Sequence, residues 1–149
     1  MKILMVCLGN ICRSPLAEGI MQLKIEQYNL DWTVESAGTS SWHIGKQPHK
    51  DSINIALEHN IDISQQKARQ FIASDFAKFD LILAMDSQNY IDICKLAPTD
   101  LHKEKVKLIL NYTNPNTNKA VPDPYYEGGF DVVFDMIEAA CQILIKKVN

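Results

Sequence analysis

The sequence predicts a single α/β domain of three layers, in which helices cover both faces of a four-stranded parallel sheet. Short apolar runs alternate with longer amphipathic stretches along the chain, which is typical of strands joined by helices. No internal repeat, low-complexity tract or linker-like change in composition interrupts this alternation. At 149 residues the chain has the length of one domain, and such a chain buries about two-thirds of its unfolded surface. We therefore expect one domain over residues 1–149.

Four short apolar segments are expected to form the sheet. Residues 3–6 and 81–85 are continuously apolar, which is typical of central parallel strands covered on both faces. Residues 33–37 are of mixed polarity and residues 106–110 include a lysine, so these two segments are expected at the edges. In such sheets, ligands bind outside the carboxyl ends of the strands.

Helices are expected between these strands. The first begins where Ser14 provides a hydroxyl N-cap and Pro15 occupies the first helical position, and it continues to about residue 29. Amphipathic segments predict further helices at about residues 48–59 and 87–96, with a shorter helical signal at 65–78. The last helix has the clearest pattern, because its apolar residues recur at helical spacing: Phe130, Val133, Phe134, Ile137, Ala140, Cys141 and Leu144.

The composition argues against a nucleic-acid-coating protein and against a membrane span. Fifteen Lys plus Arg against eighteen Asp plus Glu give a net charge of −3 at pH 7, whereas nucleic-acid binders usually have a basic excess. No apolar stretch approaches the roughly 20 residues that cross a bilayer, and the apolar run at the N-terminus is too short for a signal-peptide core. We therefore expect a cytoplasmic protein with reduced thiols and no nucleic-acid or membrane partner.

The residues after the first strand are expected to form a cradle for an oxyanion. Residues 7–15 read CLGNICRSP, so a thiol, a glycine, an asparagine, an arginine and a hydroxyl stand between a strand and a helix. Backbone N–H groups of such a loop converge on one point, and the helix N-terminus adds partial positive charge, which favours a thiolate at Cys7. Arg13, one of two arginines in the chain, can hold two oxygens of a tetrahedral anion. The expected binding loop comprises Leu8, Gly9, Asn10, Ile11, Cys12 and Ser14.

This loop closely resembles the phosphate loop of the low-molecular-weight protein tyrosine phosphatase family. The family opens with a strand and the string V-C-x-G-N-I-C-R-S-P, and residues 6–15 match every fixed position. The resemblance implies a metal-free enzyme without a cofactor, which hydrolyses phosphotyrosine proteins or peptides and aryl phosphates through a cysteinyl-phosphate on Cys7. It also implies inhibition by phosphate-like oxyanions, and we expect a monomer.

A phosphomonoester hydrolase also needs a general acid, and Asp123 is the best candidate. It stands in the string VPDPYY before the last helix, where the family has a D-P-[YW]-Y loop that supplies the acid. By the same resemblance, Tyr125 and Tyr126 would line the substrate cleft. The alternative is that Asp123 only begins a turn and that the two tyrosines only cap the final helix.

Further family motifs extend the resemblance over nearly the whole chain. Residues 36–39 and 42–45 match S-A-G-T and W-x-x-G, so Trp42 would form the opposite cleft wall and Ser36 would hydrogen-bond Asn10. The strings KARQ and MDSQN match two more stretches. Gln66 departs from the family, because many members have a histidine there that helps to brace the loop asparagine. We expect Gln66 to support a differently connected network around Asn10.

The other three cysteines and the four histidines are not expected to take part directly in the reaction at Cys7. Cys12 is either a small loop filler or, as the resemblance favours, a redox partner that forms a disulfide with Cys7 under oxidation. Cys94 and Cys141 are expected to be packing residues. The histidines lack metal-ligand spacing and are expected at the surface, at positions His43, His49, His59 and His102.

Two other functions remain as alternatives. An arsenate reductase uses a related phosphate loop, but it needs further thiols to relay a disulfide and has no use for Asp123. Cys94 has no partner cysteine near it in the sequence. A non-catalytic phosphotyrosine- or anion-binding module would keep the cradle without turnover, and the intact Cys7, Arg13 and Asp123 speak against it.

Overall fold

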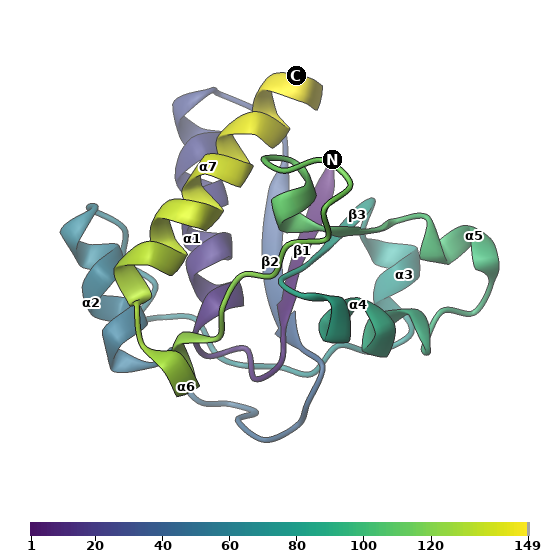
Figure 1. The fold of residues 1–149 in the computed structure, drawn as a ribbon, viewed down its shortest axis with the longest axis horizontal. Coiled ribbons are helices and arrows are strands. Elements are labelled where there is room, and N and C mark those ends of the chain that lie inside the picture. Colours follow the sequence, from purple (N-terminus) through teal and green to yellow (C-terminus); the bar gives the residue numbers. More distant parts are fainter. Residues whose placement is uncertain (149) are drawn as a thin grey trace.

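Strand β1 runs through the middle of a four-stranded, all-parallel sheet with the order β2–β1–β3–β4 (Figure 1). The computed structural model describes residues 1–148. The strands are β1 (Lys2–Cys7), β2 (Thr33–Gly38), β3 (Leu81–Ala84) and β4 (Val106–Leu108). The prediction of an α/β sheet with two central and two edge strands is therefore confirmed.

The continuous apolar run of β1 is explained by burial on both faces of the sheet. Ile3, Met5 and Cys7 belong to one hydrophobic cluster. Leu4 and Val6 belong to another on the opposite face. Because successive side chains of a strand point to opposite faces, a strand covered on both sides is apolar at consecutive positions, and only Lys2 at the start of β1 is exposed.

The helices form two layers around this sheet. The first layer holds α1 (Arg13–Gln27), α2 (Lys50–Glu58) and α7 (Phe130–Val148), which contact one another. The other side carries α3 (Asp75–Lys78), α4 (Ser87–Cys94) and α5 (Asp100–Lys103) (Figure 1). Two short helices, η1 (Ile109–Asn111) and α6 (Pro124–Glu127), lead back toward α7. None of the helices in the described residues is long and apolar enough to cross a membrane.

The start of α1 differs from the prediction. The helix begins at Arg13 with Cys12 as its N-cap, and no side chain caps it. The prediction that Ser14 is the N-cap was wrong. Its hydroxyl lies 3.0 Å from the Cys7 sulfur instead. Pro15 is the third helical residue and not the first, but it remains in the first turn, where backbone N–H groups have no helical partner.

The helical signal at 65–78 was mostly wrong. Only α3 at its end is helical, and the earlier part runs as an irregular segment along the loop side of the sheet. Gly38 N donates to Arg69 O at 2.8 Å, and Phe71 N donates to Gly38 O at 2.7 Å. Through these hydrogen bonds the segment pairs with the end of β2 as a short parallel bridge. This pairing outweighs the weak helical pattern of residues 65–74. The predicted strand at 106–110 is also shorter, since η1 begins at Ile109.

The last helix follows its predicted stripe closely. Six of the seven stripe residues are buried, and Phe130 is half-buried at the helix start.

The carboxyl ends of β1, β2 and β3 meet at one end of the sheet, where the loop between β1 and α1 lies.

Candidate active site

Cys7 lies at the end of β1, on the floor of a small cavity. Its side chain is buried, and its sulfur is 3.0 Å from Ser14 Oγ. Asn10 N donates to the same sulfur at 3.3 Å. A hydroxyl and a backbone amide thus approach the sulfur from the loop that follows it. Both contacts come from residues that follow Cys7 closely in the chain.

Asn10 holds the loop together. Its backbone has φ 55°, a left-handed conformation that asparagine adopts more readily than most residues. Its side-chain Nδ2 donates to Ser14 Oγ at 2.8 Å and to Ser36 Oγ at 3.0 Å. Its Oδ1 accepts from Arg69 N at 3.0 Å. One side chain therefore joins the loop, helix α1, strand β2 and the segment after α2.

Gln66 lies away from this network. Its Nε2 donates to Pro15 O at 3.2 Å, and its buried Oε1 has no hydrogen-bond partner within residues 1–148. The structure therefore places Gln66 against the first turn of α1 and not against Asn10. The position facing Asn10 Oδ1 is taken by the backbone of Arg69.

Glu18 extends the network, and sequence reasoning missed it. Ser36 Oγ donates to Glu18 Oε1 at 2.6 Å, which continues the chain of contacts from Asn10 into α1. Burial raises the pKa of the Glu18 carboxyl above its ordinary value, and the charge of Glu35 adds to this effect. Its position one turn after Ser14 is the signal in the sequence, because residues four apart share a helix face.

Arg13 is buried between carboxylates. Its Nη1 donates to Asp86 Oδ2 at 2.7 Å and to Val121 O at 3.0 Å, while Nη2 lies 3.4 Å from Asp123 Oδ2. Burial alone would lower the pKa of Arg13, but the Cys7, Asp86 and Asp123 charges raise it above its ordinary value. The guanidinium is therefore a permanent cation beside the Cys7 loop.

Asp86 is a site residue that the sequence motif alone did not reveal, because it contacts Arg13. It has two functions in the structure, because its Oδ1 also accepts from Asn89 N at 2.8 Å and so caps α4. The feature of the sequence that could have identified Asp86 is its position directly after the apolar run of β3, at the carboxyl end of a central strand.

Asp123 begins a helical turn and also lines the cavity at Cys7. Its Oδ1 accepts from Tyr125 N at 3.1 Å, so it is the N-cap of α6 and does begin a turn. Its other oxygen faces Arg13 Nη2. The carboxyl group therefore borders the cavity at Cys7 while its backbone starts a helix.

Aromatic side chains surround the opening of this cavity. Its lining includes Trp42, Tyr125 and Tyr126 together with Cys7, Arg13 and Asp123, so segments far apart in the sequence meet here. Trp42 and Tyr126 are 64% and 69% exposed, which leaves their ring faces available to a ligand. The remaining loop residues in the lining are Leu8, Gly9, Ile11 and Cys12.

The four histidines all reach the surface, as predicted, but three of them are half-buried. His43 lines the cavity and is half-buried, with Cδ2 only 3.0 Å from the position a Cβ on Gly9 would take. His49 is also half-buried and stacks on Phe130 at 5.1 Å between ring centroids. His102 is half-buried against Phe76, and only His59 is exposed. The place of His43 directly after Trp42 was the available signal.

The other cysteines differ from Cys7 in their surroundings. Burial, followed by the charges of Cys7 and Asp123, raises the pKa of Cys12 to about 12, so it stays protonated at neutral pH. Complete burial raises the pKa of Cys141 to about 12 within the core. Cys94 packs at the margin of the second cluster. Within the described part of the chain, no group of three or more His, Cys, Asp or Glu side chains could hold a metal ion.

Comparison with known proteins agrees with this arrangement. The family model for low molecular weight phosphotyrosine protein phosphatase matches residues 2–149. A Synechocystis protein named provisionally as a low molecular weight protein-tyrosine-phosphatase is 47% identical, over 100% of this chain and 97% of its own length.

Solved structures are similar over the same length. The protein tyrosine phosphatase of Entamoeba histolytica, with Hepes in its active site, has a TM-score of 0.92 and 38% identity, and the match covers 99% of this chain and 96% of that one. A Drosophila arginine phosphatase has a TM-score of 0.91 and 33% identity, covering 99% and 97% of the two chains.

Proposed function

Because the chain belongs to the low molecular weight phosphotyrosine protein phosphatase family, we propose that it hydrolyses phosphotyrosine and other aryl phosphates through a cysteinyl-phosphate on Cys7. The observation that carries the proposal is the cavity at which the Cys7 sulfur, the Arg13 guanidinium and the Asp123 carboxyl group meet. We further propose that residues 1–149 form one catalytic domain.

In the first step, the Cys7 thiolate attacks phosphorus in line with the ester oxygen. A sulfur–phosphorus bond forms as the bond from phosphorus to the leaving phenol oxygen breaks. Backbone N–H groups of the loop and Arg13 hold the non-reacting oxygens, whose charge they stabilise. Arg13 keeps Nη1 on Asp86, and its longer contact to Asp123 through Nη2 is the one that a phosphoryl oxygen can replace.

Asp123 supplies the proton that the leaving phenolate takes up. Asp123 lines the same cavity as Cys7, which is where the ester oxygen of a bound phosphomonoester would lie. In the second step Asp123, now ionised, accepts a proton from water as the water oxygen attacks phosphorus. The sulfur–phosphorus bond breaks and Cys7 leaves as a thiolate, which Ser14 Oγ stabilises through its 3.0 Å contact.

The cleft favours an aromatic substrate. Trp42, Tyr125 and Tyr126 offer ring faces, and Ile11 adds an apolar side chain to the lining, so a phenol ring is desolvated when it enters. We therefore expect phosphotyrosine peptides to be better substrates than phosphoserine peptides. A phosphoarginine peptide is the informative third substrate, because one similar structure is an arginine phosphatase.

The test compares three variants on p-nitrophenyl phosphate and on a phosphotyrosine peptide. Cys7→Ser should lose activity by about 10⁴-fold or more, because the nucleophile is removed. Asp123→Asn should lower kcat by about 10²- to 10³-fold with little change in KM, because only proton transfer is affected. Cys12→Ser is the matched control in the same loop and should keep kcat within about tenfold, because a protonated thiol is not the nucleophile.

Two results would overturn the assignment. Turnover in Cys7→Ser comparable to the unmodified enzyme would exclude the cysteinyl-phosphate. Failure to trap a phosphorylated Cys7 by acid quench from a phosphotyrosine substrate would do the same.

The two alternatives have their own outcomes. Arsenate reduction coupled to thioredoxin would favour the reductase, although Cys94 packs in α4 at the margin of the second cluster and Cys12 is held as a thiol. Phosphopeptide binding without release of phosphate would favour a non-catalytic module. Oxidation followed by mass spectrometry of the Cys7–Cys12 peptide would test the proposed disulfide between the two thiols.

A further inference from the structure

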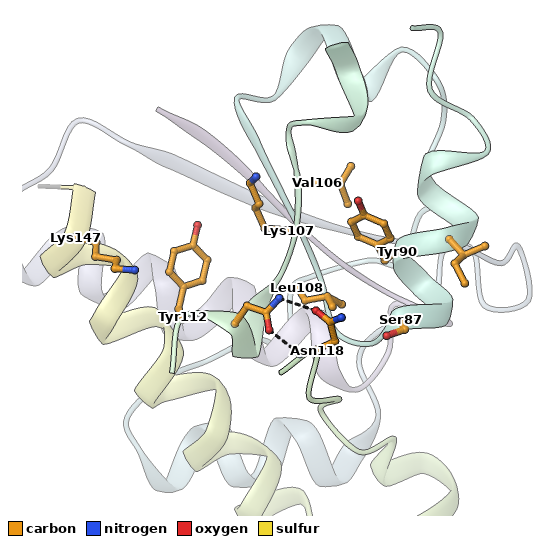
Figure 2. Close-up of a pocket in the computed structure, with 10 residues that line it drawn as sticks. Ser87, Tyr90, Val106, Lys107, Leu108, Tyr112, Asn118 and Lys147 are labelled. Atoms are coloured by element: carbon orange, nitrogen blue, oxygen red, sulfur yellow. Dashed lines mark hydrogen bonds between the residues drawn. The ribbon is translucent and has the colours of Figure 1, made fainter. Parts of the chain in front are cut away.

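A groove of about 560 Å³ lies where α4, β4, η1 and the end of α7 meet (Figure 2). None of the residues that line it lines the cavity at Cys7, so it is a separate feature of the molecule. Its volume falls within the range of about 300 to 1,000 Å³ that is usual for sites of small organic ligands.

Part of the groove is lined by apolar and aromatic side chains. Val106 and Leu108 of β4 are buried beneath it, and Ile91 of α4 lies at one side. Figure 2 shows the ring of Tyr90 on the α4 side of β4 and the ring of Tyr112 on the α7 side. A flat apolar body between these elements would therefore exchange water for aliphatic and aromatic contacts.

The charged side chains that line the groove are all positive. Lys107 of β4 and Lys147 of α7 contribute to the lining, and no aspartate or glutamate does. Within residues 1–148 neither lysine takes part in an ion pair, whereas Lys24, Lys78, Lys95 and Lys103 do. The groove is therefore lined by positive charge only, in a chain whose net charge is −3. This lining complements a negatively charged ligand.

Polar donors complete the lining. Asn111 Nδ2 donates to Asn118 Oδ1 at 3.0 Å and Asn118 N donates to Asn111 Oδ1 at 2.9 Å, which fixes the end of the groove below Leu108 (Figure 2). Burial raises the pKa of the phenols of Tyr90 and Tyr112 above the ordinary value. Like any tyrosine at neutral pH, both keep a phenolic O–H that can donate a hydrogen bond.

We propose that this groove binds a small organic anion, namely an aromatic carboxylate or a molecule of similar shape. Its ring lies over Val106 and Leu108, and its carboxylate is directed toward Lys107 and Lys147. The proposal concerns binding alone and does not depend on the reaction at Cys7.

The probe is 2-naphthoate, titrated into the full-length protein and followed by backbone amide chemical shifts. The shifts are expected to cluster in residues 87–91, 106–112 and 147, and to leave the Cys7 loop unchanged. The neutral isostere 2-naphthamide should bind at least about fivefold more weakly, because it lacks the charge that the lysines attract.

Variants of adjacent lysines test the charge. Lys107→Gln and Lys147→Gln should each weaken 2-naphthoate binding by about two- to fivefold, which is the range of exposed ion pairs. Lys146→Gln is the matched control, because Lys146 is exposed on the same helix but does not line the groove, and it should leave the affinity unchanged.

Four outcomes would overturn the proposal. They are no binding up to the solubility limit, shifts confined to residues 7–14, equal affinity for the amide and the carboxylate, or equal weakening by Lys146→Gln and Lys147→Gln. The last result would indicate general attraction of anions to the end of α7.

Discussion

Two regions border the cavity at Cys7, and they are built differently. In segment 7–14, which runs from the end of β1 into α1, Asn10, Arg13 and Ser14 are at most 3% exposed, and side-chain contacts join Ser14 to Cys7 and to Asn10. In the segment that carries Asp123, by contrast, Tyr125 and Tyr126 are 51% and 69% exposed. The half that would hold the anion is therefore part of the core, and the half that would move a proton lies on the surface.

The attachment of the Asp123 segment explains this difference. On one side Val121 N donates to Met85 O at 2.9 Å, which anchors the segment at the end of β3. On the other side Gly128 and Gly129 both have positive φ, at 72° and 75°, and join α6 to α7. Folding therefore fixes the donors of the Cys7 loop in place, as an anion site requires before the anion arrives. The position of the acid is fixed mainly at one end.

The same substitution next to each region gives the sharpest test, and Gly38→Ala, at the end of β2 against the Cys7 loop, should have the larger effect. Gly38 pairs with Cys7 in the sheet, and a Cβ there would lie 2.8 Å from Leu8 O and 3.1 Å from Asn10 N. Because these are backbone atoms, the loop must move. We expect the free energy of unfolding to fall by about 2 kcal/mol and kcat/KM by about tenfold or more. Urea unfolding and p-nitrophenyl phosphate hydrolysis measure the two effects, and a variant with normal activity would mean that the cradle tolerates displacement.

Gly129→Ala should have a smaller effect. No atom lies within 4 Å of a Cβ at this position, so the cost comes only from its positive φ. This conformation costs an L-residue about 1 kcal/mol. We expect a loss of that size in urea unfolding and kcat within about twofold, because Asp123 keeps its contacts. A loss of activity as large as that of Gly38→Ala would show that both halves of the site are equally rigid.

Glu18→Gln should have the smallest effect on activity and a characteristic pH dependence. Its folded pKa is raised, so folding takes up a proton in the pH range between the ordinary and the raised values. The stability that the protonated carboxyl group contributes is present below its ordinary pKa and is lost as pH rises through the raised one. Glutamine can still accept from Ser36, and Glu35 and Arg69 are the charges that influence the site.

The stability of Glu18→Gln relative to the unmodified protein should therefore increase as pH rises above about 4.5. Urea unfolding of both proteins at several pH values between 4 and 8 measures the difference. A difference that does not vary with pH would contradict a raised pKa for the Glu18 carboxyl group in the folded protein.

The sequence predicted the sheet and the residues of the Cys7 loop because both depend on local pattern. Continuous apolar runs marked β1 and β3, and the string around Cys7 stands in one stretch of chain. The segment at 65–78 was misread because its partner, Gly38, is distant in sequence. Glu18, Asp86 and His43 were not assigned to the site for the same reason, since each acts through a contact across the fold.

The double contact of Asp86 has a consequence for how this position tolerates mutation. One oxygen closes the first turn of α4 and the other neutralises a buried guanidinium. Asparagine would preserve the cap but remove the nearer of the two carboxylates that contact Arg13, and glutamate would preserve the charge but displace the cap by one methylene. No single replacement satisfies both demands, so folding and anion binding constrain the same residue, and a defect in one cannot be repaired there without damaging the other.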